Sequence, residues 1–220
     1  DLTVPFARFA AQHISTLGTP FKRYHMGTVW RGENTQRGRY REFMQCDFDT
    51  IGTTSAISDL ETVLVVHDLL AAIGIDKFTI HINDRRILSG ILEVLGLTSE
   101  TTHVLRCLDK TGKIPRDTLA KELQEQGVTE PSVNCLLGLG ELAGSPVDVL
   151  NELQDLVGKS VVGSQGVEAI RALLSGLSEV GVGDDRITLD PSIARGLDYY
   201  TGIVLESFLD ELPDLGSVCS

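Results

Sequence analysis

Several features that would narrow the function at once are scarce or missing from this sequence of 220 residues. No apolar run approaches the roughly 18 residues that a helix needs to cross a bilayer. No basic segment followed by an apolar one opens the chain, as a secretion signal would. The four cysteines are Cys46, Cys107, Cys135 and Cys219, with no CxxC pair among them. This scatter argues against a zinc site or a disulfide framework and favours a reducing compartment, so we expect a cytoplasmic protein.

Motifs for common catalytic centres are also missing. The five histidines show no HxxxH spacing, and neither a GxSxG sequence nor a glycine-rich P-loop occurs. We therefore expect no metal held by the protein and no nucleophilic serine. Asp84-Arg85-Arg86 could suggest phosphate binding, but capping of the helix that follows is the better interpretation, and 109–113 is expected to be a turn.

Positive charge is scarce overall but unevenly spread. The formal net charge is −12, which argues against binding a nucleic acid through bulk positive charge. From Asp1 to Gly52, however, there are seven Lys and Arg residues and five Asp and Glu residues, whereas from Thr101 to Asp185 these counts are seven and thirteen. A small basic region in an acidic chain suits a small ligand that carries phosphate.

What is present is the composition of an ordinary globular protein, with 42% hydrophobic and 23% charged residues. The length is enough for one ample domain, or a core with a smaller satellite. Because the chain begins with Asp1 and stops at Ser220 in mid-pattern, we expect it to be a piece of a longer protein.

Residues 1–98 combine helical and extended patterns. Apolar residues recur at helical spacing from Thr3 to Leu17, before Gly18. The other elements expected here are strands at 21–31 and 40–51, a helix from 58 or 59 to 72, a strand at 78–82 and a helix at 85–95.

From about Ser99 the pattern becomes helical. Helices are expected at 115–126, 131–142, 146–156 and 167–180, followed by strands at 186–189, at 199–208 and from Gly216 onward. We therefore predict an α+β fold in which 1–98 and 184–220 are two parts of one core, the second cut short, and 99–183 is an inserted all-helical subdomain.

The strands predicted at 21–31 and 40–51 sort their side chains by parity, because successive residues of a strand point to opposite faces. The even positions of the first strand are mostly bulky and are expected to face a core: Tyr24, Met26, Thr28 and Trp30. The odd face gathers Arg31, Arg41, Gln45, Asp47 and Asp49 around one ring, Phe43. Such a pattern is usually a half-solvated sheet. Here the arginine forks, which match phosphate oxygens, and a ring on which a base can stack favour a recognition surface.

This hairpin resembles motif 2 of the class II aminoacyl-tRNA synthetases in the runs VWRGEN, 29–34, and GRYREF, 38–43. Its continuation MQCDFDTIG, 44–52, resembles the histidine-specific branch, the histidyl-tRNA synthetases. The resemblance implies a class II antiparallel sheet flanked by helices. It also implies Arg31 on the ATP α-phosphate and the substrate carboxylate, Glu33 on the adenine amino group, and Phe43 under adenine. Arg39 or Arg41 would reach the outer phosphates, and Gln45 and Asp49 would face the amino acid.

Two further segments resemble the same family. ARGLDYYTG, 194–202, is similar to the histidine-specific signature, which implies that Arg195 contacts the α-phosphate and that Tyr199 and Tyr200 close the pocket around the imidazole. The opening Asp1-Leu2-Thr3 is similar to a short segment that binds the amino acid, with the acid on the ammonium group. The proline-bearing motif 1, a complete motif 3 and an anticodon-binding domain are not found.

The resemblance implies activation of histidine by ATP with Mg²⁺, transfer to tRNA(His), and a homodimer in the full-length protein. Arg31 and Arg195 would neutralise the charge that develops at the α-phosphate. Two alternatives stay open at this point. One is a non-catalytic paralogue, such as a regulatory subunit of ATP phosphoribosyltransferase or a sensor domain, and the other is a nucleotide-binding module of unknown purpose.

Overall fold

The computed structural model describes residues 1–32, 34–35, 40–99, 101–111, 114–193 and 200–220. It divides the chain into two compact units, Asp1–Ser58 and Asp59–Ser220. The order of helices and strands confirms the predicted α+β class. The boundaries predicted at 98/99 and 183/184 stay a prediction, and each unit is described below by itself.

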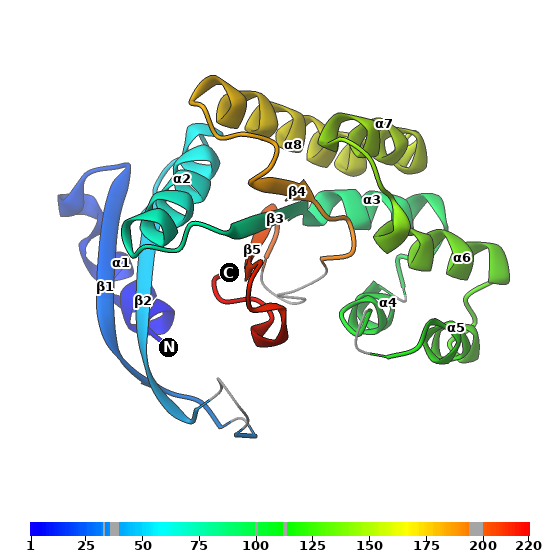
Figure 1. The fold of residues 1–220 in the computed structure, drawn as a ribbon, viewed down its shortest axis with the longest axis horizontal. Helices are drawn as coiled ribbons and strands as arrows, with labels where there is room; N and C mark the ends of the chain where they lie inside the picture. Colours follow the sequence, from blue (N-terminus) through cyan, green and yellow to red (C-terminus); the bar gives the residue numbers. More distant parts are fainter. Residues whose placement is uncertain (33, 36–39, 100, 112–113, 194–199) are drawn as a thin grey trace. The chain divides into compact units, whose positions relative to one another are not determined.

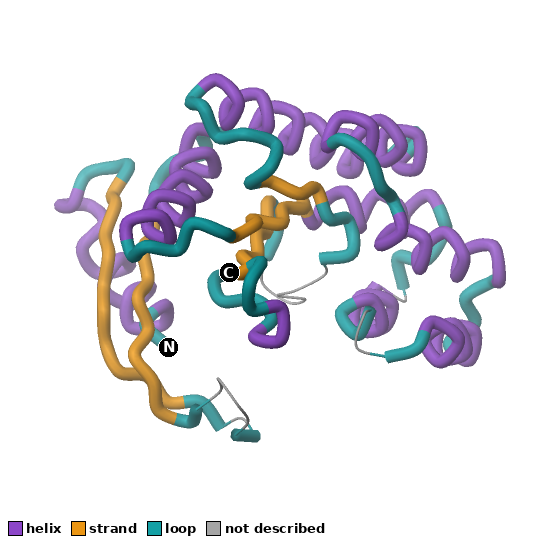
Figure 2. The backbone as a smooth tube through the Cα atoms, in the orientation of Figure 1, coloured by secondary structure: helices purple, strands orange, loops and turns teal. Residues whose placement is uncertain are grey.

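The first unit consists of one helix and one hairpin (Figures 1 and 2). Its elements are α1 (Thr3–Leu17), β1 (Phe21–Trp30) and β2 (Glu42–Ile51), in close agreement with the predicted ranges. The strands pair antiparallel, with Phe21 opposite Ile51 and Trp30 opposite Glu42. Gly52 ends β2 at a φ of 80°, where a Cβ atom would also lie 2.3 Å from the Thr19 side chain. Only glycine satisfies both conditions.

The second unit is built on a three-stranded sheet in the order β4-β3-β5. The central strand is β3 (Phe78–Asp84), parallel to β4 (Ile187–Leu189) and antiparallel to β5 (Ile203–Leu209). The sequence predicted these strands, although β5 begins at Ile203 rather than Tyr199, and Tyr199 lies outside the described residues. The third strand expected from Gly216 is reduced to one bridge, between Cys219 and Ser207.

The helices of the second unit match the predicted periodicity with three differences. They are α2 (Ile57–Ala72), α3 (Arg85–Val94), α4 (Thr101–Leu108), α5 (Arg116–Glu125), α6 (Glu130–Gly138), α7 (Pro146–Val157) and α8 (Val161–Glu179), with short 3₁₀ turns at Leu139–Glu141 and Pro213–Leu215. Helix α4 was not predicted. The 3₁₀ turn at Leu139–Glu141 replaces the end of the predicted third helix. Helix α8 begins six residues early because the Ser160 hydroxyl accepts a hydrogen bond from the Gly163 N–H and caps it there.

The main apolar core lies in the second unit. Phe78, Ile80 and Ile82 of β3 are fully buried, as are Ile87 and Ile91 of α3. Helices α3, α7 and α8 pack against one another, and in Figure 1 α3 continues from the end of β3 with α7 and α8 above it. This part of the chain supplies the hydrophobic burial that holds the fold together.

Helices α3 and α8 approach unusually closely. A Cβ atom at Gly90 of α3 would lie 2.4 Å from the Cα atom of Gly163 in α8, and one at Gly166 would lie 2.9 Å from the Ile87 side chain. No larger residue fits these positions unless the helices move apart. The glycines therefore set the distance between the two helices.

Candidate functional site

The odd face of the hairpin forms a ladder of paired side chains. The register places Arg23 opposite Asp49, Gly27 opposite Gln45, and Val29 opposite Phe43. Helix α1 packs on this face, because the Leu2 side chain approaches Gly27 and the Phe6 ring stacks on Phe21 at 6.4 Å between centroids. The polar residues predicted for recognition thus share one face.

Arg31 stands where β1 ends, at the loop end of this ladder. Its Nε donates to Asp1 Oδ1 at 2.9 Å, and its guanidinium carbon lies 5.1 Å from the centroid of the Phe43 ring. The Arg31 N–H donates to the Arg41 carbonyl oxygen, which fixes the backbone across the strands. The fold therefore brings together three predicted site residues: Asp1, which precedes α1, Arg31, which follows β1, and Phe43 of β2.

The other end of the ladder holds a second charged pair. Arg23 Nη2 lies 2.6 Å from Asp49 Oδ2, and the Arg23 guanidinium lies 4.1 Å from the centroid of the Phe6 ring. Burial raises the pKa of Asp49 above its ordinary value; Arg23 partly offsets this rise, while the nearby Asp47 charge adds to it. Between the two ends, Gln45 Nε2 donates to Asp47 Oδ1 at 2.6 Å.

The remaining predicted residues have different outcomes. Leu2 is buried, Thr3 is exposed as the first residue of α1, and Arg41 and Tyr200 are exposed. The residues that lie outside the described part of the chain are Glu33, Arg39, Arg195 and Tyr199. The roles that the resemblance implies for all of these residues stay predictions.

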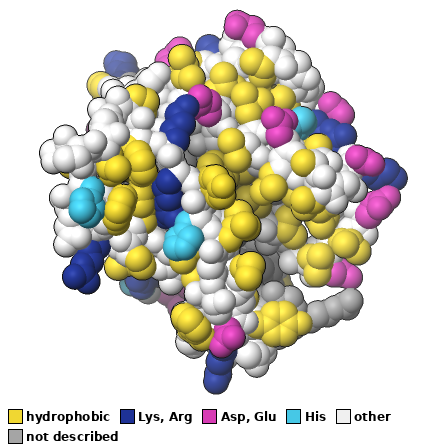
Figure 3. All heavy atoms as spheres, turned by 90° about the vertical axis from the view of Figure 1, so that its left-hand side faces the viewer, with side chains coloured by type: hydrophobic (Ala, Val, Ile, Leu, Met, Phe, Trp, Pro, Cys, Tyr) yellow, Lys and Arg dark blue, Asp and Glu magenta, His cyan; other side chains and the backbone are white. Residues whose placement is uncertain are grey.

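The even face of the hairpin corrects one expectation. Tyr24, Met26, Trp30 and Met44 are 61–79% exposed, so these bulky side chains do not face a core. Figure 3 shows the left-hand side of the view in Figure 1, where hydrophobic side chains are exposed among Lys, Arg and His. Parity assigned the faces correctly but not their burial, because burial depends on where α1 packs, and α1 packs on the odd face.

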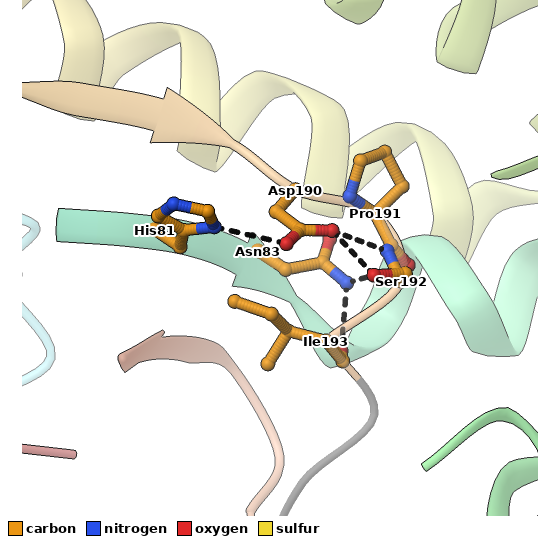
Figure 4. A network of polar contacts seen from close by, with 6 residues as sticks. All are labelled: His81, Asn83, Asp190, Pro191, Ser192 and Ile193. Atoms are coloured by element: carbon orange, nitrogen blue, oxygen red, sulfur yellow. Dashed lines mark hydrogen bonds and ion pairs between the residues drawn. The ribbon is translucent and has the colours of Figure 1, made fainter. Parts of the chain in front are cut away.

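A network in the second unit connects β3 with the segment that follows β4 (Figure 4). The buried Asn83 side chain donates through Nδ2 to the carbonyl oxygens of Pro191, at 3.2 Å, and Ile193, at 3.0 Å. Asp190 accepts from the Ser192 hydroxyl at 2.6 Å and lies 3.0 Å from His81 Nδ1. Residues 190–193 are thereby fixed at the carboxyl end of β3, directly before the predicted signature segment.

The electrostatics of this network favour an ionised carboxylate. Burial alone would raise the pKa of Asp190, but hydrogen bonds from His81 and Ser192 outweigh it and hold the pKa below its usual range. Beyond the signature segment, the Gly202 carbonyl oxygen accepts from the Arg85 N–H at 2.9 Å. Both flanks of residues 194–199 are thus bound to the end of β3.

Two functional candidates escaped the sequence analysis. Parity placed Arg23 on the odd face, but nothing in the sequence showed that it pairs with Asp49 in particular. Asn83 gave no signal, because its partners follow it by more than 100 positions. By contrast, the capping role expected for Asp84 is confirmed, since its side chain accepts from the Arg86 N–H at the start of α3.

Two other kinds of site can be considered among the described residues, a metal centre and a membrane-spanning helix. No group of three or more His, Cys, Asp or Glu side chains gathers there as metal ligands. No helix among them has the length and apolar character needed to span a membrane.

Comparisons with known protein sequences place these residues in a family context. The sequence profile described as Histidyl-tRNA synthetase matches residues 1–215. A histidine–tRNA ligase of Rhodopirellula baltica is 57% identical over the whole chain, and one of Wolinella succinogenes is 46% identical. In both cases the alignment covers 50% of the relative, so the chain spans about half the length of the curated relatives it matches.

Solved structures give the same result. A histidyl-tRNA synthetase from Nostoc sp. superposes on the whole chain, and on 51% of its own, with a TM-score of 0.91 at 32% identity. A Bacillus halodurans protein titled as an ATP phosphoribosyltransferase regulatory subunit/histidyl-tRNA synthetase has a TM-score of 0.81 at 20% identity, over 96% of this chain and 53% of its own. At that identity the likeness shows a shared fold only.

Proposed function

The chain belongs to the histidyl-tRNA synthetase family, and on that premise we propose that it carries residues that activate histidine with ATP for transfer to tRNA(His). In the first step, a carboxylate oxygen of histidine attacks the α-phosphorus of ATP, and the bond to pyrophosphate breaks. In the second, a hydroxyl of the tRNA attacks the histidyl carbonyl carbon, and AMP leaves.

One observation carries this proposal: the Arg31 guanidinium contacts both the Asp1 carboxylate and the Phe43 ring. A phosphate at the guanidinium and a base on the ring can belong to one nucleotide, because the two groups are adjacent. The carboxylate beside them suits the ammonium group of an amino acid. Charge neutralisation and positioning are what adenylation requires, since the attacking nucleophile comes from the substrate itself.

We assign the other residues by their place on the ladder. Gln45 and Asp49, farther from the loop on β2, would face the amino acid, with Leu2 and Thr3 of the α1 start beside it. Arg41, with Arg39, would reach the outer phosphates, and Glu33 the adenine amino group. For Arg195, Tyr199 and Tyr200, the resemblance of the 194–202 segment to the histidine signature supports roles at the α-phosphate and the imidazole.

Mg²⁺ would enter as the counterion of the outer phosphates of ATP, which is its usual mode of binding in enzymes that act on nucleotides. We propose no protein cage for it, and no step above depends on one. A homodimer and a cytoplasmic location are proposed for the full-length protein from its family. The regulatory-paralogue alternative fits less well, because the relatives at 57% and 46% identity are named as histidine–tRNA ligases.

The test is histidine-dependent exchange of pyrophosphate into ATP by the full-length enzyme. Replacing Arg31 with Ala should lower kcat/KM by about 100-fold or more, because it removes the donor aimed at the reacting phosphate. Arg31→Lys should recover only part of the loss, since lysine lacks the planar fork. Arg8→Ala is the matched control, because Arg8 is exposed on α1. Full exchange by the Arg31→Ala enzyme would contradict the assignment.

Calorimetric titration separates the alternative functions. An activating enzyme should bind histidine and an unreactive ATP analogue, whereas a plain nucleotide-binding module should ignore histidine. A regulatory paralogue should bind histidine without catalysing exchange.

A further inference from the structure

Arg23 is a largely enclosed charged group on the odd face of the hairpin. Its side chain is 11% exposed, beneath the Phe6 ring of α1, and that of Asp49, opposite on β2, is 25% exposed. Burying an arginine side chain is unfavourable unless its charge is paired with a group of opposite charge. The sequence analysis gave it no role.

The contact between Arg23 and Asp49 leaves hydrogen-bonding capacity unused. Nη2 and Oδ2 lie 2.6 Å apart, within ion-pair distance, and Arg23 Nε has no hydrogen-bond partner. Among the described residues, Arg23 Nε, Arg23 Nη2, Asp49 Oδ2 and Gln45 Oε1 are buried without a hydrogen-bond partner. Buried polar atoms are rarely left unpaired. Two of them, Asp49 Oδ2 and Gln45 Oε1, are acceptors that a polar ligand beside the pair can use.

The charges around Asp49 have opposing effects. Burial and the neighbouring Asp47 favour the neutral acid, whereas Arg23 favours the carboxylate. Across from Asp47 stands His25, which is exposed on β1, and α1 contributes the uncharged Phe6 ring to the pair. Arg23 is therefore the group that keeps Asp49 an acceptor.

We propose that Arg23 is a positioning residue for histidine recognition: it holds the Asp49 carboxylate ionised and oriented so that this carboxylate accepts the imidazole N–H. This inference rests on the proposed function, in which Asp49 faces the amino acid. An ionised carboxylate favours binding of a side chain that donates a hydrogen bond to it. It disfavours apolar analogues of similar size, because they would leave the carboxylate unpaired. Arg23 need not touch the substrate.

The experiment uses the full-length enzyme and its pyrophosphate exchange from pH 5.5 to pH 8.5. Arg23→Leu should raise the KM for histidine by about 10-fold near neutral pH, because the Asp49 carboxylate loses the group that holds it in place. The KM for ATP should stay within about 2-fold, because Arg31 and Phe43 stand at the other end of the ladder. Arg23→Lys should be intermediate, since it keeps the charge but loses the fork.

The pH profile gives a second readout. Removing Arg23 lets the pKa of Asp49 rise further, so the acidic limb of kcat/KM for histidine should move to higher pH. The imidazole of free histidine titrates in the same range but affects both enzymes equally. Arg8→Leu, the same chemical change at an exposed position of α1, should leave the limb unmoved.

A double-mutant cycle tests whether Arg23 acts through Asp49. In the Asp49→Asn background, Arg23→Leu should add little to the KM for histidine. An equal effect on ATP and histidine, an unmoved acidic limb, or an undiminished penalty in that background would each overturn the inference. If Arg23→Leu does not fold, Arg23→Lys still decides the inference, through a rise in the KM for histidine without an equal rise in the KM for ATP. Pyrophosphate exchange by the unmodified enzyme tests the proposed function separately. If that enzyme shows no histidine-dependent exchange, the inference is overturned together with the proposed function.

Discussion

The two units of this protein are stabilised in different ways. In the first, Leu2 and Val29 are the buried apolar residues among those described, and the contacts are ion pairs, cation–π contacts and a backbone ladder. In the second, every strand and most helices contribute buried aliphatic side chains, and glycines bring α3 against α8. The residues of the hairpin for which we propose a recognition role therefore lie in the unit with few buried apolar side chains.

This difference has a physical cause. A surface that binds nucleotide and amino acid must present charged and polar groups to solvent, and such groups cannot supply the hydrophobic burial that stabilises a fold. The second unit supplies that burial. Substitutions in the hairpin should therefore change binding more than stability, and substitutions beneath the sheet of the second unit should do the reverse.

The largest stability effect is expected where α3 meets α8. Gly90→Val should destabilise the 220-residue chain by about 3 kcal/mol, because a side chain at Gly90 meets the backbone of Gly163. Urea unfolding measures the loss. Gly138→Ala is the control, since no atom lies within 4 Å of its Cβ position, and it should be neutral or slightly stabilising. An unchanged midpoint for Gly90→Val would mean that the helices separate freely.

A smaller loss is expected at the end of β3. Asn83→Ala should cost about 2 kcal/mol, because the buried carbonyl oxygens of Pro191 and Ile193 lose their donor. The same unfolding curves measure it, with Asn151→Ala, exposed on α7, as the control. In the full-length enzyme the variant should also lower kcat for exchange if these residues hold the signature segment in place. Loss of stability with unchanged kcat would limit Asn83 to a structural role.

The smallest effect tests the corrected face of the hairpin. Met44→Lys should change the stability of the 220-residue chain by about 0.5 kcal/mol or less, because Met44 is 71% exposed. Val29→Lys, on the opposite face, should cost about 2 kcal/mol or more, since Val29 is 2% exposed. Equal losses at the two positions would remove the distinction between the faces.

Elements that depend on local sequence were predicted well, whereas contacts between segments far apart in the sequence were not. Helix α1 and the strands β1 and β2 were predicted closely, because each depends on a local period and on a nearby glycine. Helix α4 was missed because its buried residues, Val104 and Leu105 among them, show only two turns of periodicity. The parallel pairing of β3 with β4 was likewise not predicted, since it joins Ile80 to Ile187 across the whole helical segment.

The sequence by itself determined the α+β class, the two faces of the hairpin and, through the runs at 29–34, 38–52 and 194–202, the family. These are properties of alternation and of short motifs, which the order of residues contains. Only the tertiary structure decided that α1 covers the odd face, that Arg23 pairs with Asp49 beneath Phe6, and that Asn83 holds residues 191–193. Each of these joins segments that are remote or ambiguous in sequence, and packing alone selects which of the possible partners meet.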